Sequence, residues 1–398
     1  LLASSAASDV YKRQGLSRDL GITRGEAKNY IDLGKDCSTA EVNPLFSDSV
    51  YIDRLSRIPA VMEMPYNDIV RKFIDMYAGR LRNQVSFMLS ACNFYMPIFE
   101  EALDAYGLPL ELKYLPIIES ALNPSAVSRA GASGLWQFMI GTGKIYGLES
   151  NSLIDERRDP IKATWAAARY LKEMYDIYGD WNLVIAAYNC GPGTINKAIR
   201  RAGGETDYWK IYNLLPKETR GYVPAFIAAN YVMTYYCDHN ICPMETNIPA
   251  STDTVQVTKN LHFEQIAELC NVPLEEVKSL NPQYKKQVIP GTTKPCTLRL
   301  PQGAISTFID KQDTIYAHRA DELFRNRKTV AVKEVTPTTR RQTSAVAGKG
   351  KLTYYKIKSG DTLSSIAEKL GVRVKDIQQW NGMSNTRIAA GKQLKIYK

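Results

Sequence analysis

The chain has 398 residues, of which 44% are hydrophobic and 23% charged, the balance of a soluble protein with several packed domains. Its net charge of +10 predicts an anionic partner, such as nucleic acid, anionic lipid or cell-wall polymer. No run of 18 apolar residues occurs, so the sequence predicts no membrane-spanning segment. None of the seven cysteines forms a CxxC pair and the three histidines lie far apart, so we expect no metal and no cofactor.

The first 64 residues are expected to form an N-terminal segment that is partly irregular. The chain begins LLASSAASDVYKRQ, without an initiator Met, and this stretch is too short and too polar for a complete signal peptide. We therefore expect a truncated or foreign start, from which export information is missing.

Residues 65–245 are rich in Ala, Leu, Tyr and Met at helical spacing. Val70, Phe73, Ile74 and Tyr77, for example, fit one face of a helix. We expect a mainly α-helical domain here.

Within this domain the stretch PIIESALNPSAVSRAGASGLWQF, residues 116–138, holds one acid, Glu119, and no Asp or Glu follows until Glu149. Its apolar neighbours predict burial, which disfavours the charged form of a carboxyl group and raises its pKa. A Glu that is protonated near pH 6–7 can act as a general acid. On this local evidence alone, a helix-capping or salt-bridged Glu remains the alternative.

The C-terminal part contains an internal repeat. Residues 257–268 align with residues 357–368 at an offset of 100, and each copy of about 45 residues predicts the order strand, helix, helix, strand. We place two small α+β domains at 252–301 and 352–398. The polar and basic residues 302–350 between them are expected to form a linker.

This repeat resembles the LysM module, a βααβ fold that binds glycans containing N-acetylglucosamine. The resemblance implies glycan contacts from Gly360, Asp361, Thr362 and Asn381 of the second copy. The first copy has residues 260–263, NLHF, where the second has GDTL. Its fold is expected, whereas its glycan binding is left open, and a structural spacer is the alternative for either copy.

Four motifs follow one another upstream: ES at 119–120, GLWQFM at 134–139, AYNCGPG at 187–193 and ETRGYVP at 218–224. Their succession resembles the lytic transglycosylases of the soluble type. It most resembles the membrane-bound lytic murein transglycosylase D group, which joins this catalytic domain to C-terminal LysM modules. The resemblance implies a lysozyme-like, mainly α fold for residues 65–245.

By the same resemblance, Glu119 is the single catalytic acid and base. Ser128 would contact the N-acetyl group near the scissile bond, and Tyr222 would lie close to Glu119. The full set of implied substrate-binding residues is Ser120, Ser128, Gln137, Met139, Tyr188, Asn189 and Tyr222.

The expected activity is cleavage of the bond between N-acetylmuramic acid and N-acetylglucosamine in peptidoglycan, with formation of 1,6-anhydromuramyl ends. One carboxylate suffices because the muramyl C6 hydroxyl replaces the water that glycosidases activate with a second carboxylate. A hydrolytic muramidase is the first alternative, with a base from Asp155, Glu156 or Asp159 in DERRDP, which is typical of a solvated or ion-paired loop. A catalytically inactive peptidoglycan-binding protein is the second.

The resemblance also implies a location and a partner. We expect a periplasmic protein of the bacterial cell envelope, anchored through a missing N-terminal lipoprotein signal. The expected partner is the peptidoglycan glycan strand, bound by a monomer. No nucleic-acid motif occurs, so nucleic acid is not expected as a partner.

Two cysteines lie in the first repeat. Cys270 takes the place of Leu370 in the second copy, and Cys296 lies just before the last strand. The βααβ fold can bring these positions close together, so we expect a disulfide that stabilises this copy.

Overall fold

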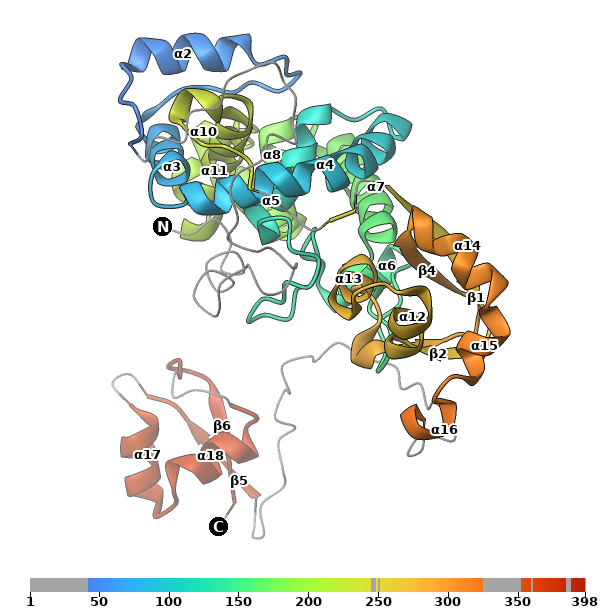
Figure 1. The fold of residues 1–398 in the computed structure, drawn as a ribbon. Helices are drawn as coiled ribbons and strands as arrows, with labels where there is room; N and C mark the ends of the chain where they lie inside the picture. The colour runs from blue at the N-terminus through green and yellow to red at the C-terminus, as the bar shows by residue number, and fades with distance from the viewer. Residues whose placement is uncertain are drawn as a thin grey trace. The chain divides into compact units, whose positions relative to one another are not determined.

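A computed structural model describes residues 42–244, 248–249, 251–324, 352–358, 361–383 and 388–397. The chain divides into two compact units, Leu1–Val335 and Thr336–Lys398. The first unit contains a helical domain followed by a small domain of strands and helices, and the second contains another small domain (Figure 1).

The helical domain confirms the expected mainly α fold. Its helices are, in chain order, α2 (Asp48–Arg57), α3 (Asp68–Ala78), α4 (Arg82–Ala105), α5 (Leu115–Ser120), α6 (Ile140–Ile145), α7 (Pro160–Tyr178), α8 (Trp181–Cys190), α9 (Pro192–Arg201), α10 (Tyr208–Ile211) and α11 (Lys217–Thr234). Helix α11 runs through the middle of the domain and packs against α3, α5 and α8. No helix in the described ranges is long and apolar enough to cross a membrane.

Local sequence signals explain where the helices begin and which face they bury. The Asn67 side chain accepts hydrogen bonds from the backbone N–H groups of Ile69 and Val70, which caps the start of α3. The predicted face of this helix is confirmed, because Val70, Phe73, Ile74 and Tyr77 are all buried.

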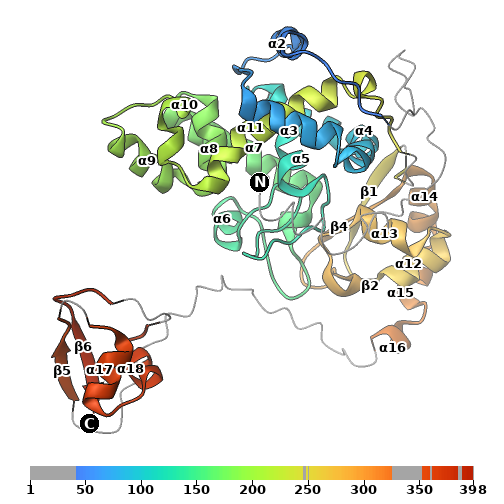
Figure 2. The same ribbon diagram turned by 90° about the vertical axis from the view of Figure 1, so that its left-hand side faces the viewer.

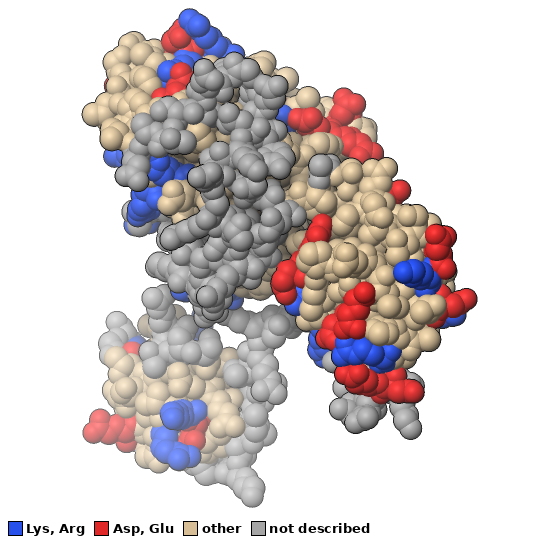
Figure 3. Space-filling model, in the orientation of Figure 1, with Lys and Arg blue, Asp and Glu red and all other residues tan. Residues whose placement is uncertain are grey.

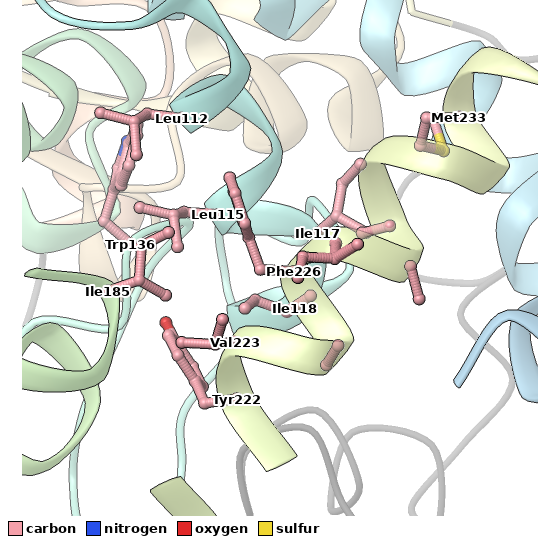
Figure 4. Packing of buried hydrophobic residues seen from close by; sticks show 14 of the residues in the cluster. Leu112, Leu115, Ile117, Ile118, Trp136, Ile185, Tyr222, Val223, Phe226 and Met233 are labelled. Atoms are coloured by element: carbon pink, nitrogen blue, oxygen red, sulfur yellow. The ribbon is translucent and has the colours of Figure 1, made fainter. Parts of the chain in front are cut away.

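The short helix α5 lies at the centre of the hydrophobic core. It buries its apolar side chains between α11, α8 and the loop that follows it (Figure 4). The labelled members of this cluster are Leu112, Leu115, Ile117, Ile118, Trp136, Ile185, Tyr222, Val223, Phe226 and Met233. Burying so many large apolar side chains fixes α5, and with it the residue near its C-terminal end, Glu119.

The small domain that follows has two antiparallel strand pairs and several helices, which Figures 1 and 2 show from two sides. Strand β1 pairs with β4 over six residues of each strand, and β2 pairs with β3 over three. Their bounds, with those of the helices, are β1 (Thr252–Val257), β2 (Asn260–His262), α12 (Phe263–Cys270), α13 (Leu274–Leu280), β3 (Val288–Pro290), β4 (Cys296–Pro301), α14 (Gln302–Asp310), α15 (Gln312–Ala317) and α16 (Ala320–Leu323).

The last three of these helices correct the expected linker, which was to begin at residue 302. Helix α14 packs against β1, β4 and α12, and α15 packs against α12. Ala304, Phe308 and Ile315 supply the buried face of this helical extension. Because polar residues separate these apolar positions, the composition of the segment did not indicate its helices. Residues 325–350 of the expected linker lie outside the described part of the chain.

The expected disulfide between Cys270 and Cys296 is wrong, because both cysteines are free. They lie in different surroundings. Cys270 ends α12 near Lys311, which follows α14, whereas Cys296 begins β4 beside Tyr284. Each packs as a small apolar side chain in the core of this domain.

The second unit has the expected βααβ order. It consists of β5 (Leu352–Lys356), α17 (Leu363–Leu370), α18 (Val374–Trp380) and β6 (Gln393–Tyr397), and β5 pairs antiparallel with β6. Leu363, Ile366, Ile377 and Leu394 are among the residues of its compact core.

Charged side chains of both signs are interspersed on the described surface that Figure 3 shows. On the domain of β1–α16, several of them pair: Arg319 binds Glu264, Glu268 and Glu322. The positive net charge therefore does not gather into one extended basic patch on the described residues of this face.

Candidate active site

Glu119 lies at the C-terminal end of α5, where the chain turns sharply. Ala121 and Leu122 adopt positive φ angles of 53° and 60°, a left-handed conformation that L-residues rarely take and that ends the helix. The Glu119 side chain is only 5% exposed. The predicted burial is thus observed, and it comes from the apolar neighbours of α5 and α11.

Burial raises the pKa of Glu119 to about 7, against an opposing effect of the hydrogen bond that Tyr222 makes to it. The Tyr222 hydroxyl donates this short hydrogen bond to Oε1 of Glu119 from the second turn of α11. The carboxyl group is therefore poised to be protonated or ionised near neutral pH, the property that a single group needs to act first as an acid and then as a base.

A cleft of about 400 Å³ opens beside this carboxyl group. Most of the side chains that the motifs predicted meet in it. These are Glu119, Ser128, Gln137, Met139, Tyr188 and Asn189.

Two predicted substrate-binding residues do not line the cleft. Ser120 is fully buried, and its hydroxyl donates to the carbonyl oxygen of Leu135 at 2.9 Å, with the Pro116 carbonyl at 3.1 Å. The prediction that Ser120 contacts the substrate is therefore wrong. Its hydroxyl group instead joins α5 to the loop of residues 126–139. Tyr222 is 1% exposed and approaches Glu119 from within the core.

One wall of the cleft is the loop of residues 126–139, in which Gln137 has an unusual setting. Its backbone has φ 49°, and its Nε2 donates to the carbonyl oxygens of Ala126 at 3.2 Å and Gly134 at 2.7 Å. Its Oε1 is buried without a hydrogen-bond partner among the described residues. Since a buried acceptor without a partner is costly, this oxygen is available to a ligand N–H or O–H group in the cleft.

The floor of the cleft comes from α8. The Tyr188 hydroxyl donates to the Trp136 carbonyl at 2.7 Å, and Oδ1 of Asn189 accepts from the Thr219 hydroxyl at 3.0 Å. The Tyr188 ring joins a cluster of aromatic rings with Phe138, Tyr146 and Tyr170. These contacts hold the floor against both the loop and α11.

Sequence reasoning assigned no role to several other residues that line the cleft, among them Glu218 and Cys190. Glu218 lies one helical turn before Tyr222 on α11, so the spacing of four residues in ETRGYVP was the signal that could have placed it at the site. Cys190 ends α8 as a free, half-buried thiol, and burial raises its pKa.

The carboxylates considered as bases for a muramidase lie elsewhere. Asp155 is 1% exposed and forms an ion pair with Arg157 at 2.8 Å, and Glu156 pairs with Lys162 at 2.6 Å. Although burial alone would raise the pKa of Asp155, the hydrogen bond and charge of Arg157 hold it below its usual value. The segment had been expected to be a solvated or ion-paired loop. It is ion-paired, and Asp155 and Glu156 are buried rather than solvated.

The residues expected to bind glycan in the second LysM-like copy have local structural partners. Oδ2 of Asp361 accepts from the Lys358 N–H and the Tyr355 hydroxyl, and Thr362 caps α17. The Asn381 side chain bonds the backbone of Ile377 and of β6, and Asn281 makes the same set of bonds in the first copy. Gly360 lies outside the described residues.

In the described ranges, no three His, Cys, Asp or Glu side chains come together in a way that could hold a metal ion. The side chains of the cleft provide a carboxyl group with a raised pKa in a largely apolar setting, with amide and hydroxyl groups around it.

Comparison with known proteins assigns three segments of the chain to families. Residues 96–211 match the Transglycosylase SLT domain, residues 251–317 match the LysM-like domain of lytic transglycosylase MltD, and residues 355–396 match the LysM domain.

Individual proteins that are similar to this chain include two lytic murein transglycosylases. The membrane-bound lytic murein transglycosylase D of Escherichia coli (strain K12) is 30% identical over 341 residues, which are 84% of this chain and 70% of that protein. The soluble lytic murein transglycosylase of the same strain is 33% identical over 124 residues, 30% of this chain and 19% of that protein. Among solved structures, the 70 kDa soluble lytic transglycosylase of Escherichia coli has a TM-score of 0.32 and 28% identity, covering 38% of this chain and 26% of that chain.

Proposed function

The chain belongs to the membrane-bound lytic murein transglycosylase D family, and on this premise we propose that Glu119 carries out both proton transfers of its reaction. The protein is a lytic transglycosylase that binds peptidoglycan through its SLT domain and the LysM domain of residues 355–396. The observation that carries the assignment of Glu119 is its buried carboxyl group, with a pKa of about 7, at the edge of the cleft.

In the first step, the protonated carboxyl group of Glu119 donates its proton to the glycosidic oxygen between N-acetylmuramic acid and N-acetylglucosamine. The bond from this oxygen to C1 breaks, and positive charge develops on the muramyl ring. In the second step, the carboxylate takes the proton of the muramyl C6 hydroxyl as its oxygen bonds to C1. The sum is a 1,6-anhydromuramyl end and a free N-acetylglucosamine end, with no water consumed.

Tyr222 supports the first step through its hydrogen bond to Oε1 of Glu119. The bond orients the carboxyl group, and it favours the ionised form that follows the first proton transfer. Without it, burial alone would hold the proton more tightly.

The polar groups of the cleft would hold the sugar rings. Oε1 of Gln137 can accept a hydrogen bond from an acetamido N–H or a hydroxyl group. Ser128, Met139, Tyr188 and Asn189 line the same space and would fix the ring whose C1 reacts.

A muramidase remains the alternative, because the Glu218 carboxylate also lines the cleft and could activate water. The products separate the two reactions. Full-length protein would be incubated with purified sacculi and the muropeptides analysed by mass spectrometry. We expect anhydro-muropeptides, one water lighter than hydrolytic products, from the wild type and from Glu218→Gln, and almost none from Glu119→Gln. Reducing-end muropeptides as the main product would contradict the transglycosylase mechanism.

The family places the protein at the bacterial cell envelope, where peptidoglycan lies. We propose in addition that it is a periplasmic monomer held at the outer membrane by a lipid anchor, and that Gly360, Asp361, Thr362 and Asn381 lie at the glycan-binding face of the second LysM domain. Partition of the native protein into detergent extracts of the membrane, followed by mass analysis for a lipidated N-terminus, tests the anchor.

A further inference from the structure

The LysM-like domain of residues 251–317 is joined to the helical domain by backbone hydrogen bonds. Asp155 donates its N–H to the Gln283 carbonyl at 2.8 Å, and Lys285 donates its N–H to the Leu153 carbonyl at 2.7 Å. Ile154 forms an antiparallel bridge with Tyr284 between these bonds. A segment of the helical domain thus pairs with a loop of the LysM-like domain like two strands of a sheet.

The two domains also share one hydrophobic core at this point. Leu153 and Ile154 are each 4% exposed and belong to the same apolar cluster as Phe263 and Leu298 of the LysM-like domain. Backbone pairing together with a shared apolar core is the mark of a fixed junction, whereas domains that move independently meet through fewer and more polar contacts.

Side-chain charges extend this junction toward the cleft. Nε and Nη2 of Arg157 donate to the two carboxylate oxygens of Asp155, both at 2.8 Å. Nζ of Lys285 donates to the Asn151 carbonyl at 2.9 Å and lies 3.7 Å from Oδ2 of Asp155. Since Asp155 and Arg157 are almost fully buried, the Lys285 ammonium group contributes to a network that water screens little.

Arg157 in turn holds the wall of the cleft. Its Nη1 donates to the carbonyl oxygens of Gly131 at 2.8 Å and Phe138 at 2.9 Å, which lie near the two ends of the segment that carries Gln137. Its own carbonyl oxygen lies so close to Gly134 that a Cβ there would be 1.8 Å away. The position of the wall is therefore fixed by two groups of Arg157. Its guanidinium group binds the wall by hydrogen bonds, and its backbone carbonyl packs against Gly134.

The first LysM-like copy differs from the second in sequence where glycan binding is expected. Its residues 260–262 align with the expected glycan-binding residues 360–362, and in this copy they form β2, which pairs with β3. This copy is thus better suited to a structural task than to binding a sugar there.

We propose that the LysM-like domain is a brace for the active site, in which Lys285 and Asp155 act as positioning residues for the cleft wall of residues 126–139. The contacts run from Lys285 to Asp155, from Asp155 to Arg157, and from Arg157 to the backbone that presents Ser128 and Gln137. The effect on catalysis rests on the proposed function of the cleft, whereas the effect on the wall does not.

Lys285→Met in the full chain tests the brace, because it removes the ammonium group and keeps much of the side-chain length. Lys286→Met is the matched control, since Lys286 is the neighbouring residue and is exposed. Lys285→Arg restores a cation. Hydrogen–deuterium exchange reports the wall directly through the amides of Ser133 and Gly134, which bond to Phe138 and Ala126. Catalytic efficiency on soluble glycan strands is measured on the same preparations.

We expect exchange in residues 126–139 to be about tenfold faster in Lys285→Met than in the control, with α3 and the core of α11 unchanged. Catalytic efficiency should fall by about tenfold, because a small displacement of substrate-positioning groups is costly. Lys285→Arg should recover most of both. Asp155→Asn should produce the same local effect, and the double variant should cost little more than either single one.

Two outcomes would overturn the brace. Equal exchange of the wall in Lys285→Met and Lys286→Met would show that the junction does not reach the cleft. A uniform acceleration of all helices would show a loss of global stability instead of a local support. Faster exchange of residues 126–139 in Lys285→Met, together with no measurable reaction by the wild type, would support the brace and contradict only the proposed function.

Discussion

Replacing Glu119 by Gln should make the folded protein more stable at neutral and alkaline pH. The folded state holds this carboxyl group with a pKa of about 7, whereas its ordinary value is 4.5. Between these two values the unfolded chain is ionised while the folded protein keeps the proton, so the free energy of unfolding falls as the pH rises, and above about pH 7 it stays at the lower level. At about 1.4 kcal/mol per tenfold change in the ionisation equilibrium, the deficit is about 3 kcal/mol.

Glutamine removes this deficit because it is neutral at every pH and can still accept the hydrogen bond of Tyr222. The variant should exceed the wild type by about 3 kcal/mol at pH 8 and by less than about 1 kcal/mol at pH 5. Urea unfolding of both proteins, followed by circular dichroism of the helical domain, gives the two differences. Glu218→Gln serves as a control, since it removes an exposed carboxylate from the same cleft.

The reasoning would be refuted by a stability difference between wild type and Glu119→Gln that is the same at pH 5 and pH 8. It would then follow that burial does not hold the proton on Glu119, and the acid in the first step would have to be sought elsewhere. A pH-dependent gain in stability combined with a reaction slowed by about 10²–10⁴-fold or more is the expected pair of results.

Four further outcomes are expected. The kcat/KM of the wild type should fall as the pH rises through about 7, because the protonated form of Glu119 is then lost, and a pH–rate profile measures this. Tyr222→Phe removes the hydrogen bond that lowers the pKa of Glu119, so the fall in its pH–rate profile should move to higher pH, and an unmoved fall would contradict this role. Asp155→Asn and Glu156→Gln should each slow the release of soluble muropeptides far less than Glu119→Gln does, and a comparable loss would return them to the list of bases. Deleting residues 336–398, a separate compact unit, should weaken retention on sacculi in a pull-down assay while cleavage of short soluble glycans is kept, and unchanged retention that fades with added salt would assign binding to the net charge.

The buried carboxyl group and the repeat could be predicted because their signals are local. The apolar residues before Glu119 predicted its burial. The offset of 100 residues between the two copies predicted two domains of one fold. The resemblance to the lytic transglycosylases implied that Gln137 and Tyr188 lie in one cleft, and both line it. Only the first two inferences depend on residues that are neighbours in sequence or that recur at a fixed distance.

What could not be predicted depends on contacts between distant segments. Asp155 and its neighbours looked like a surface loop because their partners, Lys285 and the backbone of Gln283, lie more than a hundred residues further along the chain. The resemblance implied that Ser120 is a cleft residue, yet the turn of the helix directs its side chain into the core. The distance between Cys270 and Cys296 was inferred from an ideal βααβ domain and ignored the helices that surround it.

The near-contact between Gly134 and the carbonyl oxygen of Arg157 limits how this enzyme could diversify. No side chain fits at position 134, so this part of the cleft cannot be reshaped by single substitutions without displacing the adjoining segment. The end of the loop of residues 126–139 and the end of α8 are freer: Met139 is 45% exposed, and a Cβ at Gly191 would meet no atom within 4 Å, although its φ of 81° favours glycine. We therefore expect inherited differences in glycan preference among close relatives to accumulate around Met139 and the end of α8, while the face held by Arg157 changes only when both of its segments change together.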